Sequence, residues 1–124
     1  MIALALAGLA VVAPPALASP HWNTQIKNAS DTASRVAGGC SIDKGSRTGS
    51  LLVNCPDHHS ATLVYLFTTR HSVQGKPWAR VGDTGWGRVD ESAQVSGKSI
   101  RVTLTVSGHA RVQLTTITVC YYTR

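Results

Sequence analysis

The feature that most limits the fold of this chain is an alternation of apolar and polar residues with a period of two. It is clearest in Ser99–Val106, where isoleucine, valine and leucine alternate with arginine and threonine. Successive side chains of a β-strand point to opposite faces, so this segment is predicted to be a strand with one buried face. The alternation resumes over His109–Tyr122 but changes phase near Thr115 and Thr116, which predicts a β-bulge there.

A third segment with the same pattern precedes these two. Val89, Glu91, Ala93 and Val95 lie on one side of a further predicted strand, and Ser96–Lys98 after it has the composition of a turn. Ser107 and Gly108 are expected to form the next turn. The C-terminal third of the chain is therefore predicted to be a three-stranded meander, and no window of the sequence keeps a helical period.

An unbroken apolar run, Leu63–Phe67, predicts a central strand over Ala61–Arg70 that is covered on both faces. This strand is expected to pair with Gly49–Cys55 across the loop Pro56–Ser60. Glycine and proline separate the remaining strand signals at spacings of about ten residues, as in small antiparallel folds. The chain is thus predicted to be all-β, a small antiparallel β-sandwich of about seven or eight short strands.

The N-terminal segment indicates export. Residues 1–18 carry no charged side chain, and a Pro-Pro pair lies near their end. Ala16 and Ala18 provide the small residues of a signal-peptidase site, so Ser19 is the predicted mature N-terminus. A membrane anchor is the alternative, but the uninterrupted apolar stretch is shorter than the ~20 residues a spanning helix needs. The chain is expected to be secreted, extracellular or envelope-associated, with residues 19–124 as a single domain.

Three cysteines are present, so one of them lacks a partner within the chain. Cys40 and Cys55 belong to a predicted hairpin of Arg35–Ile42 and Gly49–Cys55, which places them opposite each other. Their disulfide is therefore expected, and Cys55 with Cys120 is the rival pair. Cys120 is then either a buried thiol or an intermolecular disulfide, which predicts a monomer or a Cys120-linked dimer.

The charge distribution indicates an anionic partner. The chain has 12 Lys and Arg against 6 Asp and Glu, a net charge of +6. Such an excess favours anionic polysaccharide, cell-wall polymer or nucleic acid. Basic and aromatic residues are densest over residues 70–88, which contain a single carboxylate, Asp83. The candidate ligand-binding residues are Arg70, His71, Lys76, Trp78, Arg80, Trp86 and Arg88.

The two tryptophans of this segment have competing interpretations. Core packing is favoured for Trp78, because Trp78–Val81 alternates like a strand. Trp86 lies between Gly85 and Gly87, and both a core and a surface position stay open for it. An exposed tryptophan would stack on a sugar or a base. Nearby arginines would bind carboxylate, sulfate or phosphate.

Histidines supply the other candidate chemistry. Asp57, His58 and His59 are adjacent and have side chains that metal ions use, but the spacing favours a solvated polar turn, and no metal is predicted. A small phosphodiester hydrolase of the ribonuclease kind would use these histidines or His109, with Glu91 as a possible partner. The spacing singles out no catalytic residue, and no cofactor is predicted.

Three functions are consistent with these observations. The leading hypothesis is a non-catalytic binding or cell-envelope interaction module for an anionic polymer or glycan. The first alternative is the secreted phosphodiester hydrolase. The second is a secreted inhibitor or effector that binds a protein partner. Turnover of RNA separates the hydrolase from the others, and a stoichiometric protein complex singles out the inhibitor.

Overall fold

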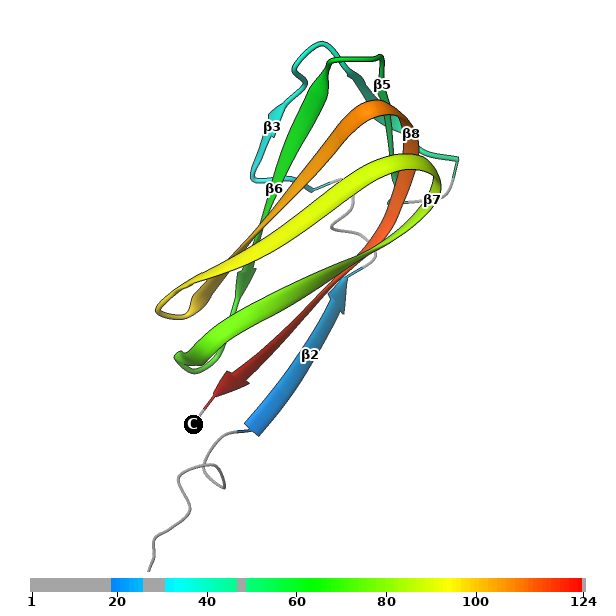
Figure 1. The fold of residues 1–124 in the computed structure, drawn as a ribbon. Coiled ribbons are helices and arrows are strands. Elements are labelled where there is room, and N and C mark those ends of the chain that lie inside the picture. Colours follow the sequence, from blue (N-terminus) through cyan, green and yellow to red (C-terminus); the bar gives the residue numbers. More distant parts are fainter. Residues whose placement is uncertain (1–18, 26–30, 47–48, 124) are drawn as a thin grey trace, which may run out of the picture.

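A computed structural model describes residues 19–25, 31–46 and 49–123, so the predicted signal peptide lies outside the described residues. Within this part the chain is all-β, without a helix, and the predicted fold class is confirmed. Its strands pair antiparallel in one curled sheet rather than in two separate sheets (Figure 1). No helix among these residues is long and apolar enough to cross a membrane. The strands are β2 (Ser19–Gln25), β3 (Ser34–Val36), β4 (Ser41–Lys44), β5 (Leu51–Cys55), β6 (Ser60–Thr68), β7 (Val73–Ser96) and β8 (Ser99–Thr123).

Strand β8 organises the sheet. One of its edges pairs with β7 along nearly its whole length. The other edge pairs in turn with β6, β5 and β2, through residues 99–107, 110–114 and 117–123. In Figure 1, β2 (blue) runs beside the last part of β8 (red). β3 and β4 extend the sheet outward, from β6 and β5 respectively.

The predicted pairing of Gly49–Cys55 with Ala61–Arg70 is wrong. β5 and β6 follow one another along the same edge of β8, instead of forming a hairpin ladder. The loop between them makes a sharp corner, with the His59 amide donating to the Pro56 carbonyl at 3.3 Å. β8 is long enough for β6 and β5 to pair with successive segments of it. The local sequence of β5 and β6 does not indicate that both pair with this third strand. β6 is nevertheless an inner strand, as predicted, because it lies between β3 and β8.

β7 and β8 are 24 and 25 residues long, far longer than the predicted strands. The expected meander differs accordingly: Ser99–Val106 and His109–Tyr122 form one strand, with Gly108 inside it at a φ of 74°. Glycines that were expected to end strands lie instead where the pairing register of β7 with β8 shifts. These shifts bend the β7–β8 hairpin, but the pairing continues beyond each of them. This bend curls the sheet.

The predicted bulge at the phase change is confirmed. Gly82 lies opposite Thr116 and Asp83 opposite Leu114, so Thr115 is the extra residue of β8. Its hydroxyl donates to the Gly82 carbonyl at 2.9 Å. The bulge keeps apolar side chains on the inner face on both sides of the slip, because it restores the period of two.

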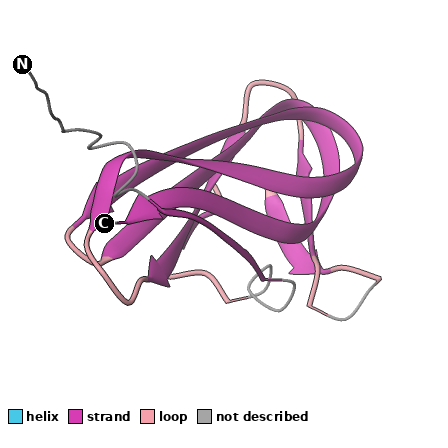
Figure 2. Cartoon of the chain, turned by 90° about the horizontal axis from the view of Figure 1, so that it is seen from below, coloured by secondary structure: helices cyan, strands magenta, loops and turns pink. Residues whose placement is uncertain are grey.

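The core lies inside the curl. The alternating apolar residues of β8 and β6 point inward and are almost fully buried. The strands wrap around this interior in Figure 2. On the opposite face of β6 Val64 is buried but Leu66 is exposed, so the expected cover on both faces is only partial. The largest buried side chains are Tyr65, Phe67, Leu63, Ile100, Leu104, Leu114 and Ile117.

A disulfide joins Cys40 to Cys55 beside the β4–β5 ladder, which confirms the expected pairing, and Cys120 is free and buried. The predicted strand Arg35–Ile42 is divided into β3 and β4. Gly38 and Gly39 cause the break, with φ values of 58° and 89° that side chains other than glycine rarely adopt. The middle of the predicted turn near Arg47 lies outside the described residues.

Candidate binding surface

Two tryptophans meet on the outer face of the sheet. The register places Trp22 of β2 and Trp78 of β7 directly opposite Cys120 of β8. Opposite residues share a face, and the two rings contact edge to face, with centroids 5.3 Å apart and planes at 82°. Trp22 is 62% exposed and Trp78 41%, whereas Cys120 is only 4% exposed. The rings therefore cover the thiol while remaining open to solvent.

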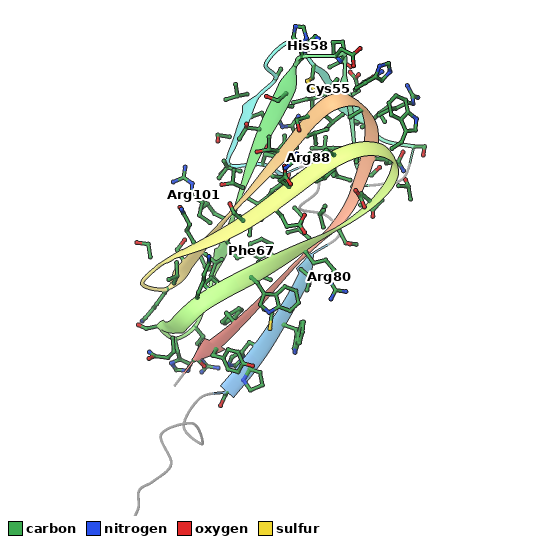
Figure 3. The ribbon with its side chains drawn as sticks, viewed as in Figure 1. Cys55, His58, Phe67, Arg80, Arg88 and Arg101 are labelled. Carbon is green, nitrogen blue, oxygen red and sulfur yellow. A yellow bond between two sulfur atoms is a disulfide. The ribbon has the colours of Figure 1, made fainter. Side chains whose placement is uncertain are left out.

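Two further side chains extend this surface. Arg80 follows Trp78 by two residues on β7, so it shares the face, and its guanidinium carbon lies 5.6 Å from the centre of a Trp78 ring. Tyr122 follows Cys120 by two residues on β8 and is also exposed. We call Trp22, Trp78, Arg80 and Tyr122 the tryptophan platform. Figure 3 shows Arg80 projecting from β7 beside β2.

Exposure of this much aromatic surface is unusual for a small domain. Tryptophan is highly buried on average, and covering an apolar side chain stabilises by roughly 1.5–3 kcal/mol. The platform leaves part of that free energy available to a ligand with a flat apolar face. Arg80 adds a delocalised cation at its edge, which binds carboxylate or sulfate through two parallel hydrogen bonds. The surface is suited to a ring that bears an acidic substituent.

The expected core position of Trp78 differs from the observed one. The alternation of Trp78–Val81 is real, but it faces the other way, with Ala79 and Val81 packed against the core. Two apolar side chains on the inner face outweigh a single tryptophan, which then contacts Trp22 instead. The sequence pattern alone does not show which face is inside.

Trp86 is exposed too, at 51%, but it lies apart from the platform. Its ring is 4.8 Å from that of His109, and His109 Nδ1 lies 3.6 Å from Asp57 Oδ1. Arg111 stands opposite Trp86 in the β7–β8 ladder. A shallow pocket of about 310 Å³ adjoins them, lined by Ser46, Leu52, Thr84, Gly85, Trp86, Arg111 and Gln113.

The other sequence-predicted residues are dispersed. Arg88 donates from Nε to Asp90 Oδ2 at 2.9 Å, and both side chains are well exposed. Arg70 and His71 lie in the connection between β6 and β7. Lys76 lines a groove on the opposite side of β7 from the Trp78 ring. Of the predicted set, only Trp78 and Arg80 belong to the platform.

Sequence reasoning missed Trp22 and Tyr122. Tyr122 follows Cys120 by two residues, which indicates that both lie on the same face. This inference requires that β8 extends past Tyr122, which the structure shows. Trp22 lies far from Trp78 in the sequence and reaches it through the pairing of β2 with β8. No local motif predicts that pairing.

The histidines do not assemble a site with Glu91. His59 Nδ1 bonds the Asp57 carbonyl at 2.8 Å, and His109 pairs with the Asp57 side chain. Glu91 lies on β7 in the groove. Among the residues that the structure describes, no three His, Cys, Asp or Glu side chains are grouped so that they could hold a metal ion.

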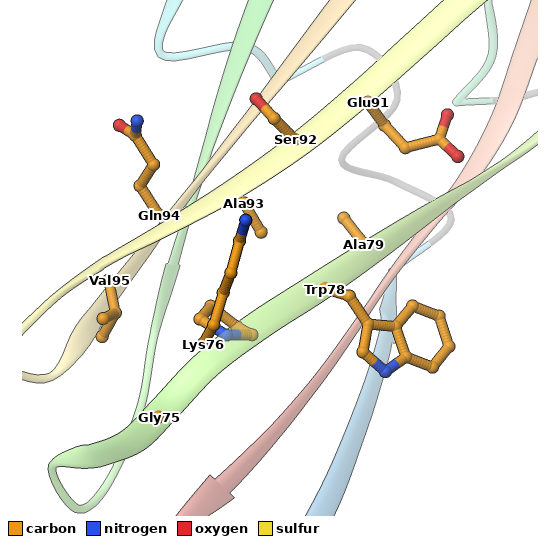
Figure 4. Close-up of a pocket in the computed structure, with 10 residues that line it drawn as sticks. Gly75, Lys76, Trp78, Ala79, Glu91, Ser92, Ala93, Gln94 and Val95 are labelled. Carbon is orange, nitrogen blue, oxygen red and sulfur yellow. The ribbon is translucent and has the colours of Figure 1, made fainter.

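The groove separates the two limbs of β7. Its volume is about 650 Å³, and Gly75–Ala79 line one side while Glu91–Val95 line the other. Figure 4 shows Ala79 and Lys76 on one limb facing the other limb, with the Trp78 ring pointing away. Partial burial, and then the nearby carboxylates of Asp83 and Asp90, raise the pKa of Glu91 above its ordinary value.

Comparisons of the chain with protein-family models, curated proteins and solved structures give no match.

Proposed function

We propose that this chain is a secreted, non-catalytic binding module for an anionic glycan, with the tryptophan platform as its binding surface. The observation that carries the proposal is the exposed Trp22–Trp78 pair with Arg80 beside it. Because the two ring planes are 82° apart, one ring stacks on the apolar face of a sugar and the other contacts the sugar from the side. The guanidinium binds a uronate carboxylate or a sulfate on that sugar or its neighbour.

Charge and compartment support the same function. The net charge of +6 attracts an anionic polymer over distances longer than a single contact and makes its binding sensitive to salt. The uncharged leader and the Cys40–Cys55 disulfide are consistent with export to an oxidising compartment. Acidic cell-wall polymers and acidic glycans are found there, and they are the ligand class that we propose.

Tryptophan fluorescence tests the proposal directly. The protein is titrated at low and high salt with a polyuronate, a sulfated glycan, single-stranded RNA and a neutral glucan. We expect a spectral shift with one of the acidic glycans, weakened by salt, and none with the neutral glucan. Equal or tighter binding of RNA would show that the ligand is a nucleic acid and not a glycan. No binding of either acidic glycan would refute the proposal.

Two variants locate the surface. Trp78→Ala removes half of the ring pair, and stacking of a ring is worth ~1–3 kcal/mol, so we expect affinity to fall roughly ten-fold or more. Trp86→Ala is the matched control, because it removes an equally exposed tryptophan outside the platform. Equal losses in both variants would show that the platform is not the site.

A phosphodiester hydrolase is the second candidate, favoured by one observation. His109 pairs with Asp57 next to the ring of Trp86, and Arg111 lies opposite Trp86. A histidine close to a carboxylate is suited to act as a general base, and an arginine neutralises a phosphate. Cleavage of RNA that disappears in His109→Ala but persists in Trp78→Ala would favour this function over glycan binding.

A further inference from the structure

The edge of β7 that faces away from β8 is open. Within the described ranges, β7 pairs with β8 alone, so a strand of 24 residues presents unpaired backbone groups along its second edge. Its two ends approach each other, because the Val73 amide donates to the Gly97 carbonyl at 3.2 Å. Beyond this junction the two limbs of β7 run side by side with the groove between them, and Figure 4 shows the residues of both limbs that line it. Unpaired edges of this kind accept strands from other chains.

The two limbs are not equally suited to pairing. The first contains Gly75 and Pro77, and its register with β8 shifts between Gln74 and Trp78. Proline lacks an amide hydrogen, and a bulge turns an edge away from regular pairing. The second limb, Val89–Ser96, has neither glycine nor proline and matches β8 residue for residue. It is therefore the limb that an added strand would follow.

The groove beside this limb has room for small side chains. Ala79 and Ala93 leave space between the limbs, and Val95 continues the apolar lining. Side chains of an added strand alternate between its faces, so every second one would enter the groove. Apolar side chains fit that volume, because the two alanines take up little of it.

The negative charge of Glu91 favours a basic residue at one position of an added strand. Glu91 and Lys76 both line the groove, but the charges that act on the Glu91 carboxylate are those of Asp83 and Asp90, which oppose its ionisation. A ligand cation beside Glu91 relieves that repulsion and pairs with a partly desolvated carboxylate.

We propose that the groove of β7 binds an extended peptide of a partner protein, which adds as a strand to Val89–Ser96. Its alternate residues are apolar, and one Lys or Arg lies beside Glu91. The backbone ladder supplies affinity, and the groove and Glu91 supply specificity. Trp78 belongs both to the groove lining and to the tryptophan platform, so the two sites are neighbours, although the Trp78 ring points away from the groove.

A synthetic peptide as long as Val89–Ser96 tests the proposal. It alternates valine or alanine with threonine and carries one central lysine, and binding is followed by fluorescence anisotropy and by amide hydrogen exchange. We expect saturable binding that protects amides of Val89–Ser96. The same peptide with alternate amides N-methylated cannot form the ladder and should not bind. Equal binding of the methylated peptide would overturn strand addition.

A charge exchange tests the role of Glu91. Glu91→Lys should weaken the lysine peptide about ten-fold, and a peptide with glutamate in place of lysine should recover that loss. Folding of the variant is confirmed by unchanged near-ultraviolet circular dichroism. If neither charge change alters the affinity of the peptide, Glu91 does not contact its basic residue and the assignment of Glu91 is overturned. A protein that sediments as a dimer, with the amides of Val89–Ser96 protected before peptide is added, would show that a second copy is the occupant and would overturn the proposal.

Discussion

Trp22 and Trp78 lie edge to face with ring centroids 5.3 Å apart, although they belong to strands on opposite sides of β8. The contact spans the central strand and covers Cys120. Both rings are therefore held by the sheet from beneath and by each other from the side. The proposed glycan surface is thus part of the same packing that fastens β2 to the rest of the fold.

This packing predicts the reactivity of Cys120 toward a thiol reagent such as DTNB. An edge-to-face pair is worth ~0.5–1.5 kcal/mol, so its loss in Trp22→Ala or Trp78→Ala should make opening of the site about 2- to 13-fold more frequent. The labelling rate of the native protein should rise by the same factor. Trp86→Ala should leave the rate unchanged, and an equal rise there would mean that labelling follows global unfolding.

The disulfide should contribute substantially to stability. It joins Cys40 and Cys55, which are separated by 15 positions, and a loop of this size corresponds to about 3 kcal/mol in the chain-entropy model. We expect the double variant Cys40→Ser with Cys55→Ser to lose about that much free energy of unfolding in urea. Cys120→Ser is the comparison variant, since Cys120 forms no disulfide. A double variant as stable as the native protein would contradict the prediction.

Gly85 is expected to tolerate no side chain. Its φ is +112°, and an added Cβ would lie 2.1 Å from the Arg111 carbonyl oxygen. Gly85→Ala combines backbone strain with a clash against backbone and should lower the free energy of unfolding by about 3 kcal/mol or more. Gly108→Ala also has a positive φ, of +74°, but meets no neighbouring atom, so it should lower stability by only about 1 kcal/mol. Thermal or urea unfolding of both variants measures the difference.

The raised pKa of Glu91 predicts that the free energy of unfolding depends on pH. Because folding raises its pKa above 4.5, the folded state disfavours the ionised carboxylate relative to the unfolded chain. This penalty is absent below the ordinary pKa and grows as pH rises through the raised one. Glu91→Gln should therefore be more stable than the native protein at neutral pH, by less than about 1 kcal/mol for so exposed a group. The advantage should vanish in acid, and a variant that is less stable at neutral pH would show instead that the carboxylate stabilises the fold.

Local patterns in the sequence predicted several features correctly. The phase change near Thr115 located a bulge, and the spacing around Cys40 and Cys55 located the disulfide. The apolar run Leu63–Phe67 located an inner strand. The bulge, the disulfide and the inner strand each depend on residues that are close in the sequence. At this range, the alternation of side chains and the composition of turns determine the backbone conformation.

The extent and the partners of the strands were not predictable in this way. Glycines at 82, 85, 87 and 108 have the composition of turns, yet the backbone continues through them because pairing with the facing strand outweighs the local preference. For the same reason β5 and β6 share one edge of β8 instead of pairing with each other.

The sequence by itself determined the all-β class and the basic character of the chain and favoured the Cys40–Cys55 disulfide over its rival, because each follows from local pattern or composition. Tertiary structure alone decided that Trp78 faces outward and meets Trp22, and that β7 keeps an open edge beside a groove. An alternating strand has two faces and two edges, and its sequence does not specify which face is buried or which edge is paired. Those choices are made by all the strands together when the sheet closes around its core.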